Sequence, residues 1–519
     1  MAEKVAPTGV WQPSINPWLM IVPVIMAVFM FALDETVSNV ALMYIAGSFS
    51  VSQNESIWIV TSYLIASGIV IPSVDFLCKL CGRKNFFIIC ILVFTTASFM
   101  CGLAQSMAMI VISRFIQGLG GGAILPLSQA IIMESFPPEK RAQSMSIFGL
   151  TIILAPTIGP LVGGWITENW SWPWIYMINV PIGVVAILMT HKLLEDPPYA
   201  KKQKNVVCDY WGLSFLCLWL VLLQIVLDKG NDADWFNAEW ICWMTFFSCV
   251  FGILFFYRQF KGENPLVDLK VLKDKNFLFG TIGQVIMMAV FLASAALLPS
   301  MLQSLLGYTP FLSGLSMGSR GLGSVLAIVI YGVTAKLLGD KFYAVVGVGL
   351  IALGGLFFGT INLNINLQAI AFPNALFGAG MFLGMTTLMT LSFSSLKNEM
   401  MTNASGLQNL LKNIGGAIGT SLATTIIARS AQKHQFMMVG NLNELNQPYV
   451  ERLEAMAQSF MSVTSGIPEA FNMAKATLYN QLLHQSHLWG YIDTFRMFAL
   501  ACLIVIPFIF FIKTPKFNK

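Results

Sequence analysis

The segment "LAPTIGPLVGGW" (residues 154–165) places two prolines and three glycines among twelve largely apolar residues. This composition disfavours a helix in water, but small residues let helices approach closely in a bilayer. Ala155, Gly159 and Gly163 recur every four residues, which predicts a smooth stripe on one helix face. The two prolines each remove a backbone hydrogen bond and predict a bend. The residues expected to pack or gate here are Ala155, Pro156, Gly159, Pro160, Gly163 and Gly164.

The rest of the chain has the composition of a membrane protein. Of its 519 residues, 56% are hydrophobic and 11% are charged, whereas a soluble protein has about 25% charged residues. Apolar runs of about 20 residues are long enough to cross a hydrocarbon core of about 30 Å. We therefore expect an all-α polytopic protein with spans near 18–41, 56–77, 85–105, 108–133, 143–166, 174–193, 211–228, 239–257, 277–300, 312–335, 342–361, 369–395, 405–428 and 490–512.

The placement of basic residues predicts the orientation. Lys and Arg concentrate in alternate loops, while the opposite short loops carry almost none beyond Lys229. Because basic loops stay in the cytoplasm and the number of spans is even, both termini are expected to be cytoplasmic. The net charge of +5 reflects this bias, so no nucleic-acid partner is expected. The nine Cys and four His show no metal-ligand pattern, and we expect neither metal nor cofactor.

Two loops indicate an internal repeat, as in transporters built from related halves. "DFLCKLCGRKNFF" (75–87) and "GVTAKLLGDKFYA" (332–344) both place a Lys three residues before a Gly that is followed by charge. We expect a six-helix bundle at 1–193, linkers and an inserted helix pair at 194–276, and a second six-helix bundle at 277–519. Within the second bundle, 429–489 is expected to form a small helical hairpin outside the membrane.

Two acidic residues in the first span are functional candidates, because charges inside a bilayer are costly. Asp34 is expected to take up and release the proton in a proton-coupled transporter. Glu35 is a possible second proton site, but adjacent helix residues point about 100° apart and both need not face a cavity. The alternative for each is a permanent pair with an interior cation.

Buried cations form the second group of candidates. Arg114 cannot release its proton, so it is expected either to hold polar groups of neighbouring helices or to tune Asp34. Arg320 and Lys412 can contact an anionic substrate, although long basic side chains also anchor helix ends. Gln117 lies one turn from Arg114. Gln117, Arg320 and Lys412 are therefore the candidate substrate-binding residues.

Several motifs together resemble the fourteen-span drug:proton antiporter branch of the major facilitator superfamily, the EmrB/QacA type. "LDETVSNVAL" resembles its first-span signature, "DFLCKLCGRK" its loop after span two, and "RFIQGLGGG" its span-four motif. "APTIGPLVGGWI" followed by "WSWPWIYMINVPIG" resembles its antiporter motif, and this pairing is specific. "LQIVLDKGNDADWF" and "GLQNLLKNIGGAIGTS" extend the resemblance over nearly the whole chain.

This resemblance implies a major facilitator fold of two six-helix bundles plus the inserted pair. It also implies proton-driven multidrug efflux across the bacterial inner membrane, with Asp34 as the coupling carboxylate. The segment at 154–165 is then expected to pack against the other half and seal the cavity on one side. Gly82 and Arg83 would belong to a cytoplasmic gate, but Asp75 and Lys79 depart from the usual pattern there and put its charge relay in doubt.

The resemblance further implies an EmrA-like periplasmic adaptor and a TolC-like outer-membrane channel as partners. Two other functions stay open. A dedicated exporter of one metabolite or siderophore would need a more polar cavity. A non-transporting receptor or scaffold would suit paired buried charges, and the absence of an evident partner for Asp34 argues against it. An enzyme is not expected, because no nucleotide loop, nucleophile elbow or metal-ligand cluster is present.

Overall fold

The computed structural model describes residues 13–56, 58–200, 202, 209–262, 267–397, 400–463 and 466–513, and every regular element in them is helical. The helices of the N-terminal part are α1 (Pro17–Phe49), α2 (Gln53–Ser56), α3 (Trp58–Val70), α4 (Val74–Cys81), α5 (Arg83–Gly102), α6 (Met107–Gly121), α7 (Ile124–Ser135), α8 (Pro138–Asn169), α9 (Trp174–Met177) and α10 (Asn179–Leu193).

The segment expected to hold the inserted pair contains α11 (Tyr210–Lys229) and α12 (Glu239–Lys261). The C-terminal helices are α13 (Lys275–Ser300), α14 (Pro310–Leu338), α15 (Asp340–Phe358), α16 (Leu367–Phe393), α17 (Met401–Val439), α18 (Gln447–Phe460), α19 (Ile467–Leu503) and α20 (Val505–Phe511). Short 3-10 or π turns are η1 (Ile71–Ser73), η2 (Pro198–Ala200), η3 (Trp235–Asn237), η4 (Leu269–Lys273) and η5 (Met301–Leu305).

Thirteen helical segments among the described residues are long and apolar enough to cross a membrane. The fourteenth expected span, 405–428, is missing from that set because polar side chains such as Gln408, Asn409 and Lys412 lower its mean hydropathy. The segment is nevertheless helical within α17, which packs along α13 and α19. For this span, therefore, membrane crossing is indicated by packing rather than by hydropathy.

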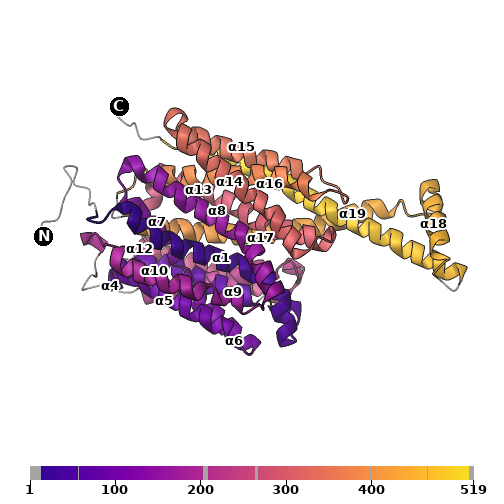
Figure 1. Cartoon of the computed structure of the whole chain (residues 1–519), viewed down its shortest axis with the longest axis horizontal. Helices are drawn as coiled ribbons and strands as arrows, with labels where there is room; N and C mark the ends of the chain where they lie inside the picture. Colours follow the sequence, from indigo (N-terminus) through magenta and orange to yellow (C-terminus); the bar gives the residue numbers. More distant parts are fainter. Residues whose placement is uncertain are drawn as a thin grey trace.

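The helices gather into two groups that follow the chain order (Figure 1). One hydrophobic core consists mainly of side chains before residue 272, and a second consists of side chains from 287 to 512. The groups meet where α8 packs against α14 and α16, and where α17 packs against α7. Figure 1 also shows α4 and α18 at opposite ends of the molecule, and we call these the α4 end and the α18 end.

The two loops that indicate a repeat have closely similar backbone geometry. Gly82 joins α4 to α5 with φ 82° and ψ 145°, and Gly339 joins α14 to α15 with φ 77° and ψ 158°. Each glycine N–H donates to the carbonyl four residues before it, in Cys78 and Ala335. Positive φ favours glycine at both turns, and the likeness supports an internal duplication.

The segment 429–489 is largely helical, and its outer helices are continuous with the neighbouring spans. Helix α17 continues to Val439, and α19 already begins at Ile467, so both run into the expected loop without a turn. A continuous helix satisfies its own backbone hydrogen bonds and needs no break at a membrane surface. Helix α18 packs on α19 through a small apolar core, and the two extend beyond the other helices in Figure 1.

Candidate functional site

A buried polar cluster surrounds Asp34, halfway along α1. The Asp34 carboxylate is 1% exposed. Its Oδ2 lies 2.5 Å from Nη1 of Arg114 on α6. Its Oδ1 accepts hydrogen bonds from Gln117 Nε2 at 3.1 Å and from Asn179 Nδ2 at 2.8 Å. Three helices, α1, α6 and α10, therefore converge on one carboxylate, and we call Asp34, Arg114, Gln117 and Asn179 the carboxylate cluster.

Arg114 is held on all sides by polar or aromatic groups. Its Nη1 also donates to Gln117 Oε1 at 2.8 Å, and its Nε donates to the Ile59 carbonyl at 3.3 Å. The guanidinium lies 4.2 Å from the ring centre of Tyr63 and 5.6 Å from that of Tyr176. A guanidinium on an aromatic face is stabilised by the ring quadrupole, so Arg114 is fixed beside Asp34.

The structure thus brings together three of the residues singled out from the sequence: Asp34, Arg114 and Gln117. It also corrects the view that Asp34 has no partner. Sequence reasoning did not single out Asn179, because an Asn carries no charge to mark it within an apolar segment. The available signal was its place in the segment "WSWPWIYMINVPIG". Gln117 contacts the carboxylate and guanidinium, so in this conformation it is a cluster member and not the wall of an open cavity.

Glu35 has different surroundings from its neighbour. Its side chain is partly exposed, and it forms no ion pair with any residue that the structure describes. The 100° step between adjacent helix residues turns it away from the carboxylate cluster. Glu35 is therefore less enclosed than Asp34 and lies outside the carboxylate cluster.

The small-residue stripe on α8 packs against α1 and not against the other half. A Cβ added to Gly159 would overlap the Thr36 hydroxyl, and one added to Gly163 would lie 3.0 Å from Val37 Cγ1. Gly164 is buried, but no atom of another group lies within 4 Å of such a Cβ, so its expected packing role stays a prediction. Ala155 is fully buried.

Helix α8 does reach the C-terminal helices, but through other residues. Gly149 lies against Thr386 of α16. The resemblance implied that this segment of α8 seals the cavity against the other half. In the structure, the stripe glycines contact α1, and other residues of α8 contact α14 and α16. The backbone is helical throughout Pro138–Asn169, and the Pro160 side chain lies outside the described residues. The bend at the prolines stays a prediction.

At the α4 end, Arg83 links the two halves. Its guanidinium forms a bidentate pair with Glu134 of α7, at 2.7 and 3.1 Å, and donates to Thr402 Oγ1 of α17 at 2.9 Å. The Asp196 carboxylate accepts from the Lys84 N–H beside it. Burial raises the pKa of Asp196 above its usual range, and this hydrogen bond opposes the shift.

The two residues that depart from the family pattern pair with each other at the same end. Lys79 Nζ lies 2.6 Å from Asp75 Oδ2, one turn away on α4. Exposed pairs of this kind contribute about 0.3–0.5 kcal/mol. The bidentate Arg83–Glu134 pair is buried and reaches Thr402, so among these contacts it is the one that spans the halves.

A second set of contacts joins the halves deeper in the protein. Gln129 of α7 donates to Gln408 of α17 at 3.0 Å, and Asn409 donates back to Gln129 at 2.9 Å. Gln408 also donates to Thr281 of α13 at 3.3 Å. We call Gln129, Gln408 and Asn409 the amide cluster. Because all its side chains are buried, separation of the halves must break these bonds inside the protein.

The two cations predicted for the C-terminal half are buried but lie apart from the carboxylate cluster. Arg320 is 1% exposed and donates from Nε to Asn374 Oδ1 at 3.0 Å and from Nη1 to Ser294 Oγ at 3.3 Å. Lys412 is 7% exposed. Neither forms an ion pair with any described residue, which is costly for a charge in a membrane.

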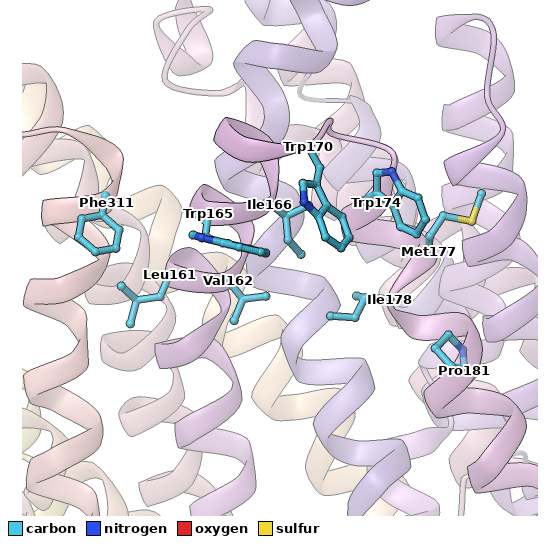
Figure 2. A pocket seen from close by; sticks show the side chains of 10 residues that line it. All are labelled: Leu161, Val162, Trp165, Ile166, Trp170, Trp174, Met177, Ile178, Pro181 and Phe311. Carbon is cyan, nitrogen blue, oxygen red and sulfur yellow. The ribbon is translucent and has the colours of Figure 1, made fainter.

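An aromatic pocket lies at the α18 end beside the stripe helix. It has a volume of about 710 Å³, within the usual size of small-molecule pockets. Figure 2 shows Trp165, Trp170 and Trp174 gathered along it, with Phe311 of α14 on the opposite side. Leu161, one of its apolar walls, also belongs to α8, so the pocket and the glycine stripe share one helix.

Among the described residues, no group of three or more His, Cys, Asp or Glu side chains is placed to hold a metal ion. The carboxylate cluster contains one carboxylate and one guanidinium in direct contact. Such a pair can exchange partners when a proton or a ligand arrives.

Comparisons with known proteins agree with this architecture. The family model "Major Facilitator Superfamily" matches residues 24–420. The chain is 30% identical over 503 residues to "Probable multidrug resistance protein EmrY" of Escherichia coli (strain K12), covering 96% of each chain. It is 30% identical over 500 residues to "Multidrug export protein EmrB" of the same strain, covering 96% of this chain and 95% of that one.

The human organic anion transporter MFSD10 (TETRAN) has a similar fold, with a TM-score of 0.62 and 13% sequence identity over 96% of this chain and all of that one. These matches confirm the family and the fold expected from the motifs, and they indicate a multi-pass transporter rather than an enzyme. The chain belongs to the Major Facilitator Superfamily and resembles its EmrB and EmrY members along nearly its whole length.

Proposed function

We propose that this protein is a proton-driven exporter of hydrophobic and amphipathic compounds. The observation that carries the proposal is the enclosed carboxylate cluster, in which Asp34 Oδ2 contacts Arg114. A proton on Oδ2 would compete with the guanidinium for the same oxygen. Protonation would therefore loosen α1 from α6, and loss of the proton would restore the contact.

Movement at Asp34 has a route to the rest of the protein through the glycine stripe. Gly159 of α8 packs on Leu33 and Thr36, which flank Asp34 and Glu35 on α1. Helix α8 in turn packs on α14 and α16. A change in α1 would thus be passed to the boundary between the halves, where alternating access takes place in transporters of this kind.

The substrate class follows from the aromatic pocket and from the relatives' names. The pocket walls are almost entirely apolar, which favours amphipathic compounds over a polar metabolite or siderophore. EmrB is named a multidrug export protein. A dedicated exporter is the weaker alternative, because no polar lining of the kind it needs is found in this pocket.

The main test is Asp34→Asn in proteoliposomes with an imposed pH gradient and a fluorescent amphipathic dye. Asn keeps the size of the side chain but cannot take up a proton. We expect uphill transport to be abolished while dye binding and the folded state persist. Asp232→Asn, which removes an exposed carboxylate between α11 and α12, is the matched control and should transport normally.

This experiment also distinguishes export from the scaffold alternative. A static Asp34–Arg114 pair would be consistent with a scaffold. A scaffold predicts that the unaltered protein moves no dye under any gradient. Full uphill transport by Asp34→Asn would instead remove Asp34 from the coupling mechanism, and Glu35 would become the next residue to test.

The orientation and partners extend the proposal. The basic loops favour a cytoplasmic α4 end and a periplasmic α18 end, with both termini cytoplasmic in a bacterial inner membrane. Helix α18 and the first turns of α19 would then face a periplasmic adaptor linked to an outer-membrane channel. Replacing residues 440–466 with a short Gly/Ser linker should spare transport in proteoliposomes and lower resistance in cells, and loss of transport in proteoliposomes would contradict this division.

A further inference from the structure

Arg320 on α14 is a buried guanidinium with few polar partners. Its guanidinium is 1% exposed and makes two hydrogen bonds, to Asn374 and Ser294, while Nη2 has no partner. The Phe377 ring lies 5.1 Å away. No carboxylate of the described residues forms an ion pair with it. Arg320 is therefore a buried positive charge with one open donor group.

The internal repeat gives this site a counterpart. Tyr63 precedes the turn glycine Gly82 by 19 residues, and Arg320 precedes Gly339 by the same 19. Tyr63 lies against Arg114 in the carboxylate cluster, and α3 packs on α6 as α14 packs on α16. Arg320 thus occupies the repeat position of Tyr63, in a cluster that has a guanidinium but lacks the acid found in the other half.

The acid is replaced by neutral groups. In the N-terminal half, the first helix of the bundle supplies the Asp34 carboxylate. In the C-terminal half, the first helix supplies the Ser294 hydroxyl, which accepts from Arg320 and donates to the Phe291 carbonyl. An uncompensated charge inside a membrane protein marks a substrate or ion pathway more often than a structural contact.

A second open donor lies on the same face of α14. Ser313 stands seven residues before Arg320, which is two helical turns toward the α18 end, and its hydroxyl is buried without a partner. Residues seven apart share one face of a helix. The Ser313 hydroxyl and Arg320 Nη2 therefore lie along one face of α14, with Ser313 nearer the α18 end.

We propose that Arg320 binds the acid group of an amphipathic anion during export, with Asn374 and Ser294 orienting the guanidinium. The ligand supplies the negative charge that the C-terminal half lacks. Because Arg320 is enclosed in this conformation, the anion reaches it when the helices around it separate. The inference rests on the proposed export function and names one class of its substrates.

The test uses three probes with one scaffold: dansyl-undecanoic acid, its primary amide and its trimethylammonium analogue. Two variants of equal shape are compared in proteoliposomes under a pH gradient. Ser294→Asp places a carboxylate beside Nη1 of Arg320, whereas Ser294→Asn places a neutral amide there. We expect Ser294→Asp to slow acid transport roughly tenfold or more relative to Ser294→Asn, since a charge-assisted hydrogen bond is worth that factor, with amide transport within about twofold.

Arg320→Gln should show the same selective loss of acid transport, and Arg452→Gln, which removes an exposed positive charge from α18, should not. Equal acid transport by Ser294→Asp and Ser294→Asn would overturn the inference, as would equal loss of all three probes in Arg320→Gln, since a structural role predicts that pattern. Wild-type transport of the amide but not the acid would also overturn it. Absence of wild-type transport for every probe would instead refute the proposed export function.

Discussion

The two halves of this transporter hold a buried guanidinium in opposite ways. Arg114 faces a carboxylate, an amide and two aromatic rings, and its charge is neutralised within its own bundle. Arg320 faces an amide, a hydroxyl and one ring, and no described acid neutralises it. Under the export function proposed above, one half carries a closed ion pair suited to proton exchange and the other presents an open charge.

The largest expected effect tests this difference through stability. Arg114→Leu should lower the free energy of unfolding by about 3–5 kcal/mol, because it leaves the buried Asp34 carboxylate without its partner. Arg320→Leu should cost no more than half as much, because it removes an unbalanced charge and leaves no carboxylate unpaired. Urea unfolding in detergent, followed by tryptophan fluorescence, measures both.

The double variant Asp34→Asn with Arg114→Leu is the control for this comparison. It should recover part of the loss caused by Arg114→Leu, because the unpaired carboxylate is gone. Equal destabilisation by Arg114→Leu and Arg320→Leu would mean that the two guanidinium groups are equally compensated, and the contrast between the halves would fail.

The sequence alone identifies the buried charged residues of both halves but does not show which of them are in contact. Charged residues within apolar runs are conspicuous, so Asp34, Arg114 and Arg320 could all be found from composition and spacing. Which of them touch could not, because contacts between α1, α6 and α10 depend on tertiary packing. Asn179 shows the limit most clearly: it lies within the quoted segment "WSWPWIYMINVPIG", yet nothing in that segment shows that its side chain contacts Asp34.

Glycine patterns were equally informative about location and less so about partners. The spacing of Gly159 and Gly163 predicts that this face of α8 packs closely against another helix. It does not predict that the other helix is α1, in the same half. The same spacing argument does not exclude Gly164, which faces open space. The span at 405–428 was expected from the sequence and is helical within α17, although its polar residues at the boundary between the halves lower its mean hydropathy.

An effect of intermediate size is expected for Gly159→Leu, which tests whether α8 connects the carboxylate cluster to the boundary between the halves. Gly159→Leu should destabilise the protein by about 1–3 kcal/mol, because extra carbons in a packed site force the helices apart, and it should block exchange or let protons leak. Gly164→Leu should leave both properties near wild type. Proton leak in sealed proteoliposomes and thermal unfolding measure the outcomes.

If Gly159→Leu holds a pH gradient and transports as the unaltered protein does, the stripe does not couple α8 to α1. If Gly164→Leu is as damaging as Gly159→Leu, the open space beside Gly164 is filled in the conformation that matters for transport. Either result would mean that the packing of Gly159 on α1 does not by itself connect the carboxylate cluster to the boundary between the halves.

The smallest expected effect concerns the amide cluster, which must open for the halves to separate at the α4 end. Gln129→Leu removes its bonds to Gln408 and Asn409, each of which contributes about 1 kcal/mol net. Only the conformation closed at this end loses them, so the equilibrium should shift toward the open one by roughly fivefold per kcal/mol. Hydrogen exchange of the backbone at 401–412 should quicken accordingly.

Gln284→Leu is the matched control, because its 2.9 Å bond to the Met385 carbonyl joins α13 to α16 within one half. That variant should leave exchange at 401–412 unchanged. Equal exchange in both variants would place the closure elsewhere, at the Arg83 contact with Thr402 or at the hydrogen bond from Ser405 to the Pro126 carbonyl.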